Sequence, residues 1–351
     1  MNRSILLLAS VLVAGNAGAQ ALQTATETAH TATAATSTAS SPTTTAQAPT
    51  TSPQATFRSN VDLVALNVVV TDSDQKYVSG LRPSDFAVFE DGVQQDVSFF
   101  GASGVPLDLA ILLDTSASMT GKMQLVQQSA IGFLNTLRAD DRTIIVDIKD
   151  ATKIMYPLGG DLEAAKQAIL STSPRGGTAL YNGAYLTLKE MVKERRGNSE
   201  VRRQALVVLS DGDDTASLVS YDDLMDLAKQ SGIGIYTITM RSKYLVSQAA
   251  SRGHSYFSQS EFGMKALAQE TGARSFFPTE LGELSGVYAA IAEELATQYA
   301  IGYASKNPRM DGSYRRVIVQ IADKPGVRTR TRAGYTAPRV QRTAAVVPAT
   351  H

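Results

Sequence analysis

One short stretch of the sequence carries side chains that could bind a hard cation. Asp114–Ser118 (DTSAS) directly follows the apolar run Leu109–Leu113. A strand that turns into a helix presents Asp114, Ser116 and Ser118 at the carboxyl edge of a sheet, where a carboxylate and neutral hydroxyls can converge on one ion. A ligand set made only of oxygen favours magnesium, manganese or calcium.

The elements that must position this stretch alternate between apolar strands and amphipathic helices. The strands are expected at 107–113, 143–148, 205–209 and 234–239, and the helices at 122–137, 162–170, 179–194, 221–231, 262–271 and 281–295. This alternation predicts an α/β fold, with a doubly wound, mostly parallel sheet covered by helices on both faces. Functional residues are expected at the carboxyl ends of its strands.

Asp114–Ser118 resembles the first part of the metal-ion-dependent adhesion site of von Willebrand factor type A domains. Gly176–Leu180 resembles the second loop of that site, in which Thr178 would supply a hydroxyl. Leu206–Gly212 resembles the third loop, in which Asp211 would supply a carboxylate. Because the three stretches follow in the family's order, the sequence is identified as a member of this family, whose fold is Rossmann-like.

The resemblance implies a binding site that keeps one position of the metal open. Ser116, Ser118 and Thr178 would touch the ion directly or nearly so, while Asp114 and Asp211 would often act through water. Few charged ligands leave the cation electrophilic, so an acidic side chain of a protein partner can complete the site. We therefore expect a non-enzymatic, metal-dependent adhesion or assembly module that holds Mg²⁺, with Mn²⁺ or Ca²⁺ as alternatives.

Three further features of these loops lead to explicit expectations. Serine and threonine also cap helices, and Ser118 or Thr120 is a candidate cap, although capping does not explain the matches in the other two loops. Asp147 stands where the family usually continues apolar, so it is expected either to face a partner or to mark an early end of its strand. Asp213 and Asp214 are expected to form a solvated acidic loop, with a second cation as the alternative.

The segments on both sides of the α/β region, 105–297, have the composition of short strands. Residues 57–103 form a small β unit, in which Asp72–Asp74 is a turn because the later oxygen ligands of a calcium loop are missing. Residues 298–336 are expected to pack against that unit. Motifs within 81–92 and 298–303 resemble the bacterial exported proteins termed VWFA-related.

The two ends of the chain predict export. Residues 1–19 have the layout of a cleavable signal peptide, residues 20–56 form a disordered linker of Thr, Ala, Ser and Pro, and residues 337–351 form a tail. The expected location is therefore periplasmic, cell-envelope or secreted. Contact with a membrane is expected only if the signal segment is kept as an anchor. Cysteine is absent, so the fold forms without disulfides.

Composition argues against several functional classes. The 33 basic and 33 acidic residues give no net field for nucleic acid. A magnesium-dependent phosphatase needs a proton donor where Ser116 stands, and a phosphate loop at 120–123 lacks the required hydroxyl at Met123. The three histidines, His30, His254 and His351, give little basis for a catalytic or zinc site. The main alternative is a metal-independent scaffold of an envelope complex, and a phosphatase-like hydrolase is less favoured.

Overall fold

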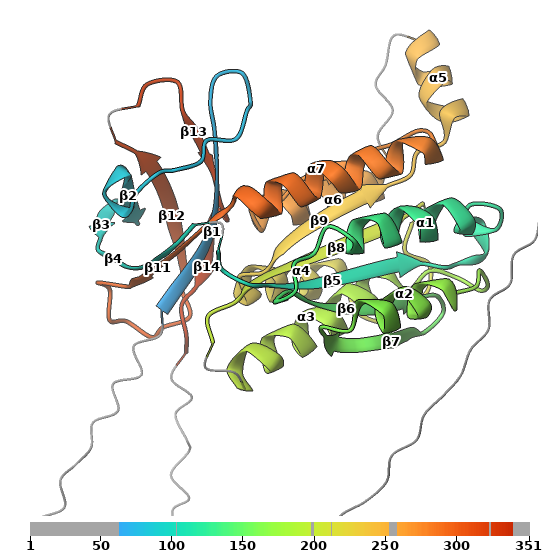
Figure 1. The fold of residues 1–351 in the computed structure, drawn as a ribbon, viewed down its shortest axis with the longest axis horizontal. Coiled ribbons are helices and arrows are strands. Elements are labelled where there is room, and N and C mark those ends of the chain that lie inside the picture. The colour runs from blue at the N-terminus through green and yellow to red at the C-terminus, as the bar shows by residue number, and fades with distance from the viewer. Residues whose placement is uncertain are drawn as a thin grey trace, which may run out of the picture. The chain divides into compact units, whose positions relative to one another are not determined.

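A six-stranded sheet forms the centre of the α/β part of the chain (Figure 1). The computed structural model describes residues 63–102, 104–197, 200–211, 213–252, 258–322 and 324–339. The strand order is β10-β9-β8-β5-β6-β7. The strands are β5 (Leu107–Asp114), β6 (Arg142–Ile148), β7 (Thr152–Gly159), β8 (Arg203–Ser210), β9 (Gly234–Thr239) and β10 (Ser275–Phe276). Only β7 runs antiparallel to its neighbour, so the sheet is mostly parallel, as predicted.

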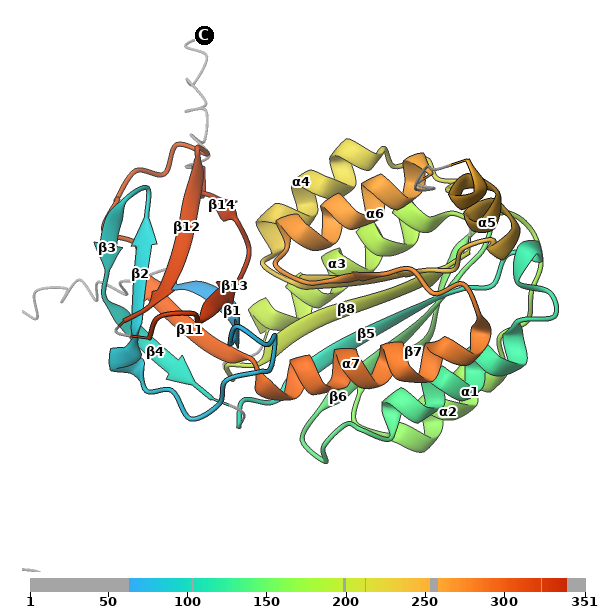
Figure 2. The ribbon, with the colours of Figure 1, turned by 90° about the horizontal axis from the view of Figure 1, so that it is seen from above.

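Helices cover both faces of this sheet (Figure 2). The helices are α1 (Met123–Leu134), α2 (Leu162–Leu170), α3 (Leu180–Gly197), α4 (Tyr221–Ser231), α5 (Lys243–Ser251), α6 (Gln259–Glu270) and α7 (Leu284–Thr297). Side chains alternate along β5, so Leu109 and Ile111 belong to the core under α1, α2 and α7, whereas Ala110 and Leu112 belong to the core under α3, α4 and α6. Every residue of β5 is buried, as expected of a central parallel strand.

The segments before and after the α/β region form two four-stranded antiparallel sheets, with the orders β13-β1-β11-β4 and β14-β12-β2-β3. Their strands are β1 (Leu63–Thr71), β2 (Phe86–Glu90), β3 (Val93–Gln95), β4 (Val97–Gly101), β11 (Tyr299–Ala304), β12 (Tyr314–Ile321), β13 (Arg328–Arg330) and β14 (Gly334–Thr336). N-terminal β1 pairs with C-terminal β11, and β2 pairs with β12. The two sheets enclose one core of alternating side chains, among them Leu66, Val88, Ile301 and Val319.

Several details differ from the expectations. β7 was not predicted, because this edge strand contains Pro157 and has no fully buried residue, so it lacks the apolar run of a buried strand. Helix α5 and the short strands β10 and β14 were also not predicted. Ala337 was placed in the tail, yet it is 3% exposed and its amide donates to the Ser313 carbonyl at 2.9 Å, so the folded region extends beyond β14.

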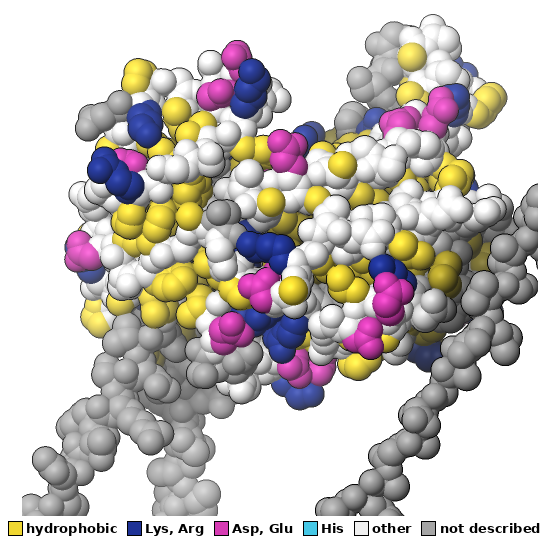
Figure 3. Space-filling model, in the orientation of Figure 1, with side chains coloured by type: hydrophobic (Ala, Val, Ile, Leu, Met, Phe, Trp, Pro, Cys, Tyr) yellow, Lys and Arg dark blue, Asp and Glu magenta, His cyan; other side chains and the backbone are white. Residues whose placement is uncertain are grey.

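Other expectations concern turns and charge. The Asp72 carboxylate accepts the amides of Asp74 and Lys76, each at 2.9 Å, which confirms a turn at this point. Acidic and basic side chains are interspersed on the face shown in Figure 3. Within the ranges that the structure describes, no helix is long and apolar enough to span a bilayer. The predicted signal peptide, the predicted linker, His30, His254 and the residues beyond Arg339 lie outside the described residues.

Candidate metal centre

The first loop begins at the buried carboxyl end of β5. Asp114 is fully buried; its Oδ1 accepts the Ser116 amide at 2.9 Å and its Oδ2 accepts the Ser210 hydroxyl at 2.6 Å. Burial raises the pKa of the Asp114 carboxyl, an effect that the hydrogen bonds from Ser210 and Ser116 oppose and the nearby charge of Asp211 increases. A desolvated carboxylate of this kind is stabilised by a nearby cation.

A row of oxygen atoms leads from this carboxylate to the surface. Ser116 Oγ lies 2.8 Å from Ser118 Oγ, and Ser118 Oγ donates to Asp211 Oδ1 at 2.7 Å. Ser116 is buried, whereas Ser118 is exposed. The structure therefore brings together four of the five predicted residues, Asp114, Ser116, Ser118 and Asp211.

The idea that Ser118 or Thr120 caps the following helix is wrong. Helix α1 has Lys122 as its N-cap and no side-chain cap. The Ser118 hydroxyl is instead directed to Asp211, and the Thr120 hydroxyl donates to the Ala117 carbonyl at 2.7 Å. Both hydroxyls are thus used within the loops at the sheet edge.

Backbone contacts place the second loop beside the other two. The Ala117 amide donates to the Gly176 carbonyl at 3.0 Å, and the Thr178 carbonyl accepts the Thr215 amide at 2.9 Å. Thr178 is only 5% exposed. In the part of the chain that the structure describes, no hydrogen bond joins its hydroxyl to the other four predicted side chains. Thr178 therefore shares the edge with them without joining their network.

Lys122, in the stretch compared with a phosphate loop, adds a cation to this edge of the sheet. Its Nζ forms an ion pair with Asp211 Oδ2, and the Asp211 side chain is 3% exposed. Gly121 precedes it with a φ of +83°, a conformation that glycine adopts readily. Asp211 therefore has a hydroxyl on one oxygen and an ammonium on the other.

Asp147 supports the first loop from the neighbouring strand, so both expectations for it are wrong. β6 continues to Ile148, and the Asp147 carboxylate is 3% exposed, accepts the Thr115 hydroxyl and pairs with Lys149 at 2.9 Å. The Thr115 amide also donates to the Ile148 carbonyl at 2.8 Å. A buried charge is tolerated here because it has both a hydrogen-bond donor and a counter-ion.

Asp150 supports the second loop and was not predicted. Its Oδ1 accepts the Gly177 amide at 2.5 Å. Gly176 has a φ of +70°, and a Cβ at this position would lie 1.9 Å from Asp150 Oδ2. In the sequence, only the position of Asp150 could have indicated its role, because Asp150 follows β6 at the same sheet edge as the three loops.

Asp214 is half-buried and hydrogen-bonded within the protein, which corrects the expectation of a solvated acidic loop for this residue alone. Its Oδ2 accepts the Tyr181 amide at 2.8 Å, and its Oδ1 accepts the Ser217 amide at 3.0 Å. Tyr181 lies in the first turn of α3, where amides lack partners within the helix and favour a negative charge. Asp213, in contrast, is exposed.

The donor set fits a hard cation better than a soft one. Hydroxyl and carboxylate oxygens predominate, and the described residues contain no cluster of three or more His, Cys, Asp or Glu side chains that could form a more highly charged site. Two carboxylates and two linked hydroxyls therefore define the centre, with an ammonium at its rim.

Residues 108–287 match the family model of the von Willebrand factor type A domain. Similar solved structures include a von Willebrand factor type A protein from Catenulispora acidiphila (12% identity, 82% of this chain and 76% of that chain, TM-score 0.44). They also include proximal thread matrix protein 1 from the mussel byssus with a zinc-occupied MIDAS motif (16% identity, 55% of this chain and 48% of that chain, TM-score 0.45). A third is an aerotolerance-related membrane protein from Bacteroides fragilis (16% identity, 54% of this chain and 98% of that chain, TM-score 0.42). The chain thus spans about half of the mussel protein. No curated protein matched significantly.

Proposed function

This chain belongs to the von Willebrand factor type A family, and we propose that it binds a protein partner through a divalent metal held at the carboxyl edge of its central sheet. The observation that carries the proposal is the row of Ser116, Ser118 and Asp211 oxygens, with successive separations of 2.8 and 2.7 Å, beside the buried Asp114 carboxylate. Closely spaced oxygen atoms at an accessible edge are suited to a hard cation.

Each of the five residues has a proposed part in the site. Ser116, Ser118 and Thr178 hold the ion through their hydroxyls, while Asp114 and Asp211 orient these hydroxyls and balance the charge. Mg²⁺ is the proposed ion, with Mn²⁺ and Ca²⁺ as alternatives. Once bound, the ion supplies an electrophilic position that attracts an acidic side chain of the partner. The exposure of Ser118 supports access from solvent.

The chain is proposed to act as a binding module and not as an enzyme. The position of a phosphatase's proton donor is Ser116, whose hydroxyl is already hydrogen-bonded with Ser118. The buried Asp114 carboxylate accepts bonds from Ser116 and Ser210 on its two oxygens, so it is held as a structural acceptor instead of being presented to a substrate.

Membership of the exported bacterial VWFA-related subgroup, and with it a periplasmic, envelope or secreted location, is also proposed. The two flanking motifs support it because they meet in the β sheets. The Leu81 amide donates to Tyr299 Oη at 3.1 Å, the rings of Phe86 and Tyr299 lie 5.1 Å apart, and Tyr303 Oη donates to Glu90 at 2.9 Å.

A metal-independent scaffold is the second candidate, and the contact between Lys122 and Asp211 favours it. An ammonium already neutralises the carboxylate there. In a scaffold this ion pair would be permanent, and the oxygen row would serve only to hold the three loops together.

Calorimetric titration of Mg²⁺, Mn²⁺ and Ca²⁺ into the full, metal-stripped chain separates the two candidates. We expect saturable binding of about one ion per chain, abolished by Asp114→Ala and retained by Asp213→Ala, a control at an exposed acidic residue of the same edge. Circular dichroism should show that Asp114→Ala stays folded. Absence of binding to the native chain, also when a glutamate-containing peptide is added, would favour the scaffold.

A further inference from the structure

A second site is indicated by a cavity of about 520 Å³ on the opposite side of the fold from the loops at the carboxyl edge. It is bounded by the flanking β sheets and by the ends of α3 and α4. Its lining contains five arginines and no aspartate or glutamate. These arginines are Arg195, Arg196, Arg309, Arg315 and Arg332. A cavity of this size matches a small-molecule site.

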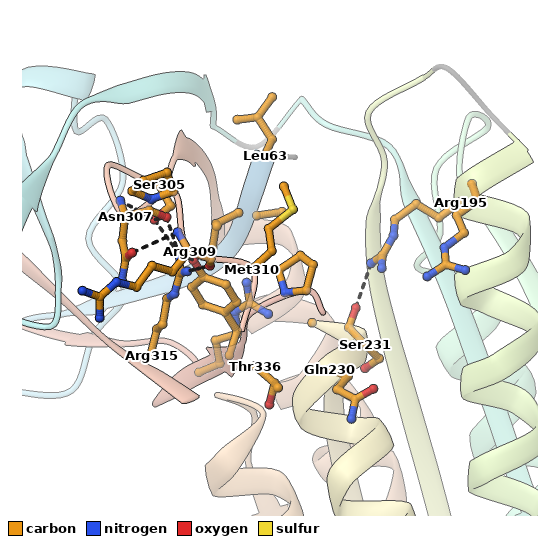
Figure 4. Close-up of a pocket in the computed structure, with 18 residues that line it drawn as sticks. Leu63, Arg195, Gln230, Ser231, Ser305, Asn307, Arg309, Met310, Arg315 and Thr336 are labelled. Atoms are coloured by element: carbon orange, nitrogen blue, oxygen red, sulfur yellow. Dashed lines mark hydrogen bonds between the residues drawn. The ribbon is translucent and has the colours of Figure 1, made fainter. Parts of the chain in front are cut away.

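The arginines come from separate parts of the chain and reach the cavity from different sides. Arg195 and Arg196 lie in the last turn of α3, and Arg309 follows β11. Arg315 lies on β12, and Arg332 follows β13. Figure 4 shows Arg309 and Arg315 on one side of the cavity and Arg195 on the other. This convergence of positive charge is a property of the tertiary fold.

Arg315 is the only one of the five whose charge is balanced by a carboxylate in the described residues. It is 3% exposed, and its Nη1 lies 3.3 Å from Glu90 Oε1 and 2.8 Å from Ser305 Oγ. Glu90 also accepts hydrogen bonds from the hydroxyls of Tyr303 and Tyr335, so its hydrogen-bonding capacity is used within the β sheets. The other four arginines form no ion pair with a described carboxylate.

Arg332 is the most unusual of the four. Its Nε is shielded from solvent and has no hydrogen-bond partner among the described residues. Its guanidinium lies 5.3 Å from the centre of the Tyr335 ring. Burial, together with the like charge of Arg195, lowers the pKa of Arg332 to about 10, but the group stays charged at neutral pH. A half-buried cation without a counter-ion is stabilised by an anionic ligand.

Helix ends explain only part of this cluster. Arg195 donates to the Ser231 carbonyl at 2.9 Å, which satisfies an acceptor at the C-terminus of α4. Arg196 lies in the last turn of α3, where a cation is favoured by the helix dipole. Neither role accounts for Arg309 and Arg332, which lie in the segments after β11 and β13 and line the same cavity.

We propose that this arginine-lined cavity binds a ligand through its phosphate groups. A single carboxylate carries one negative charge, whereas several unpaired guanidinium groups face the cavity. A phosphate dianion offers more charge and several acceptor oxygens in a compact group that the planar arginine fork binds in a bidentate manner. Ser305, Asn307 and Thr336 add neutral polar groups to the lining.

Titration of inorganic phosphate and pyrophosphate into the full chain, in buffer stripped of divalent ions, tests the proposal apart from the metal site. We expect saturable binding of pyrophosphate, about one per chain, that weakens as salt rises. Arg196→Gln combined with Arg309→Gln, at two exposed side chains, should lower the affinity by about tenfold or more. Arg332→Gln should do the same.

Arg316→Gln is the matched control, because this exposed arginine neighbours Arg315 on β12 but is not part of the lining. It should leave the affinity unchanged, and equal melting temperatures without ligand would show that all variants fold. Binding to vesicles with phosphatidylglycerol, compared with vesicles of phosphatidylcholine, reveals whether the phosphate is that of a lipid headgroup. The titration of phosphate and pyrophosphate and the vesicle experiment are the two arms of the test, and arginine-dependent binding in either arm supports the site. No binding in both arms, binding that the cavity variants retain, or binding of polyglutamate alone would overturn it.

Discussion

Ser118 and Asp211, 93 positions apart in the sequence, are joined by a hydrogen bond of 2.7 Å from the serine hydroxyl to the carboxylate. This bond closes the first loop onto the third. Lys122 binds the other oxygen of the same carboxylate. Hydroxyl, carboxylate and ammonium therefore lie together where the proposed metal is held, and their competition can be measured.

Lys122→Gln should strengthen metal binding. The ammonium pairs with Asp211 when no metal is bound, so a divalent ion has to compete with it. Because the Lys122 side chain is about a third exposed, at 34%, the pair is partly screened. We expect the dissociation constant for Mg²⁺ to fall roughly fivefold, or about 1 kcal/mol. Calorimetry measures this dissociation constant, with Lys166→Gln on α2 as a control. Weaker binding of Mg²⁺ by Lys122→Gln would mean that Lys122 helps to position Asp211.

Thr115→Val should destabilise the fold through the first loop. The Thr115 hydroxyl is fully buried and donates to the charged Asp147 carboxylate, and a bond to a charged group contributes about 1.5–3 kcal/mol. Thr143→Val is the matched control, since this buried hydroxyl donates to the neutral Leu109 carbonyl at 3.0 Å. Thr143→Val should lower the free energy of unfolding by only about 1 kcal/mol. Urea unfolding without metal compares the two, and equal losses would contradict the role given to Asp147.

Gly176→Ala should displace the second loop. The positive φ alone costs about 1–2 kcal/mol for an L-residue, and the added methyl would also collide with Asp150. Gly80→Ala isolates the first effect, because Gly80 has a φ of +76° and open space around it. We expect Gly176→Ala to lose more unfolding free energy than Gly80→Ala and to bind metal weakly. Normal metal affinity in a folded Gly176→Ala would show that this loop does not shape the site.

Glu294→Gln should weaken the junction between α7 and the β sheets. The Glu294 side chain is 1% exposed; it accepts the Tyr236 hydroxyl at 2.7 Å and pairs with Arg330 of β13 at 2.6 Å. Because the Arg330 side chain is a third exposed, solvent partly screens this ion pair. We therefore expect Glu294→Gln to lower the free energy of unfolding by about 2 kcal/mol. Denaturant unfolding measures this loss, and Glu293→Gln, at an exposed neighbour on α7, should have little effect. A double-mutant cycle with Arg330→Gln that shows no coupling would contradict the assignment.

Elements with a strong local pattern could be predicted from the sequence. Strand β9 and helices α2 and α4 have the expected bounds, because a buried apolar run or an amphipathic period lies between clear capping residues. Edge strand β7 has no such pattern. Its position depends on pairing with β6, which is a tertiary contact.

The candidate site likewise contains some residues that short motifs predict and others that depend on tertiary contacts. Asp114, Ser116, Ser118 and Asp211 carry their signal in short motifs, and the structure brings them together, while their role as metal ligands stays a prediction. The full environment of Asp147 could not be predicted locally, because Lys149 is two positions away but the hydrogen-bond donor Thr115 lies 32 positions away. A charge in an apolar strand looks unfavourable until that hydroxyl is known.

The arginine cavity illustrates the same limit. Its five arginines are spread from Arg195 to Arg332, and nothing in their spacing links them. Only the packing of the β sheets against the ends of α3 and α4 creates the excess of positive charge. A balanced overall composition, with 33 basic and 33 acidic residues, therefore hides a strongly basic local site.

The pairing of β4 with β11 has a mechanical consequence. Gly101, just before the α/β region, lies opposite Ala300, just after it, so this region begins and ends on adjacent strands. Tension applied between Leu63 and Thr336 would be carried by the antiparallel β ladders that join the two flanks. The α/β region lies outside that line of force. The loops at its far edge would therefore keep their geometry under a pull that strains the rest of the protein.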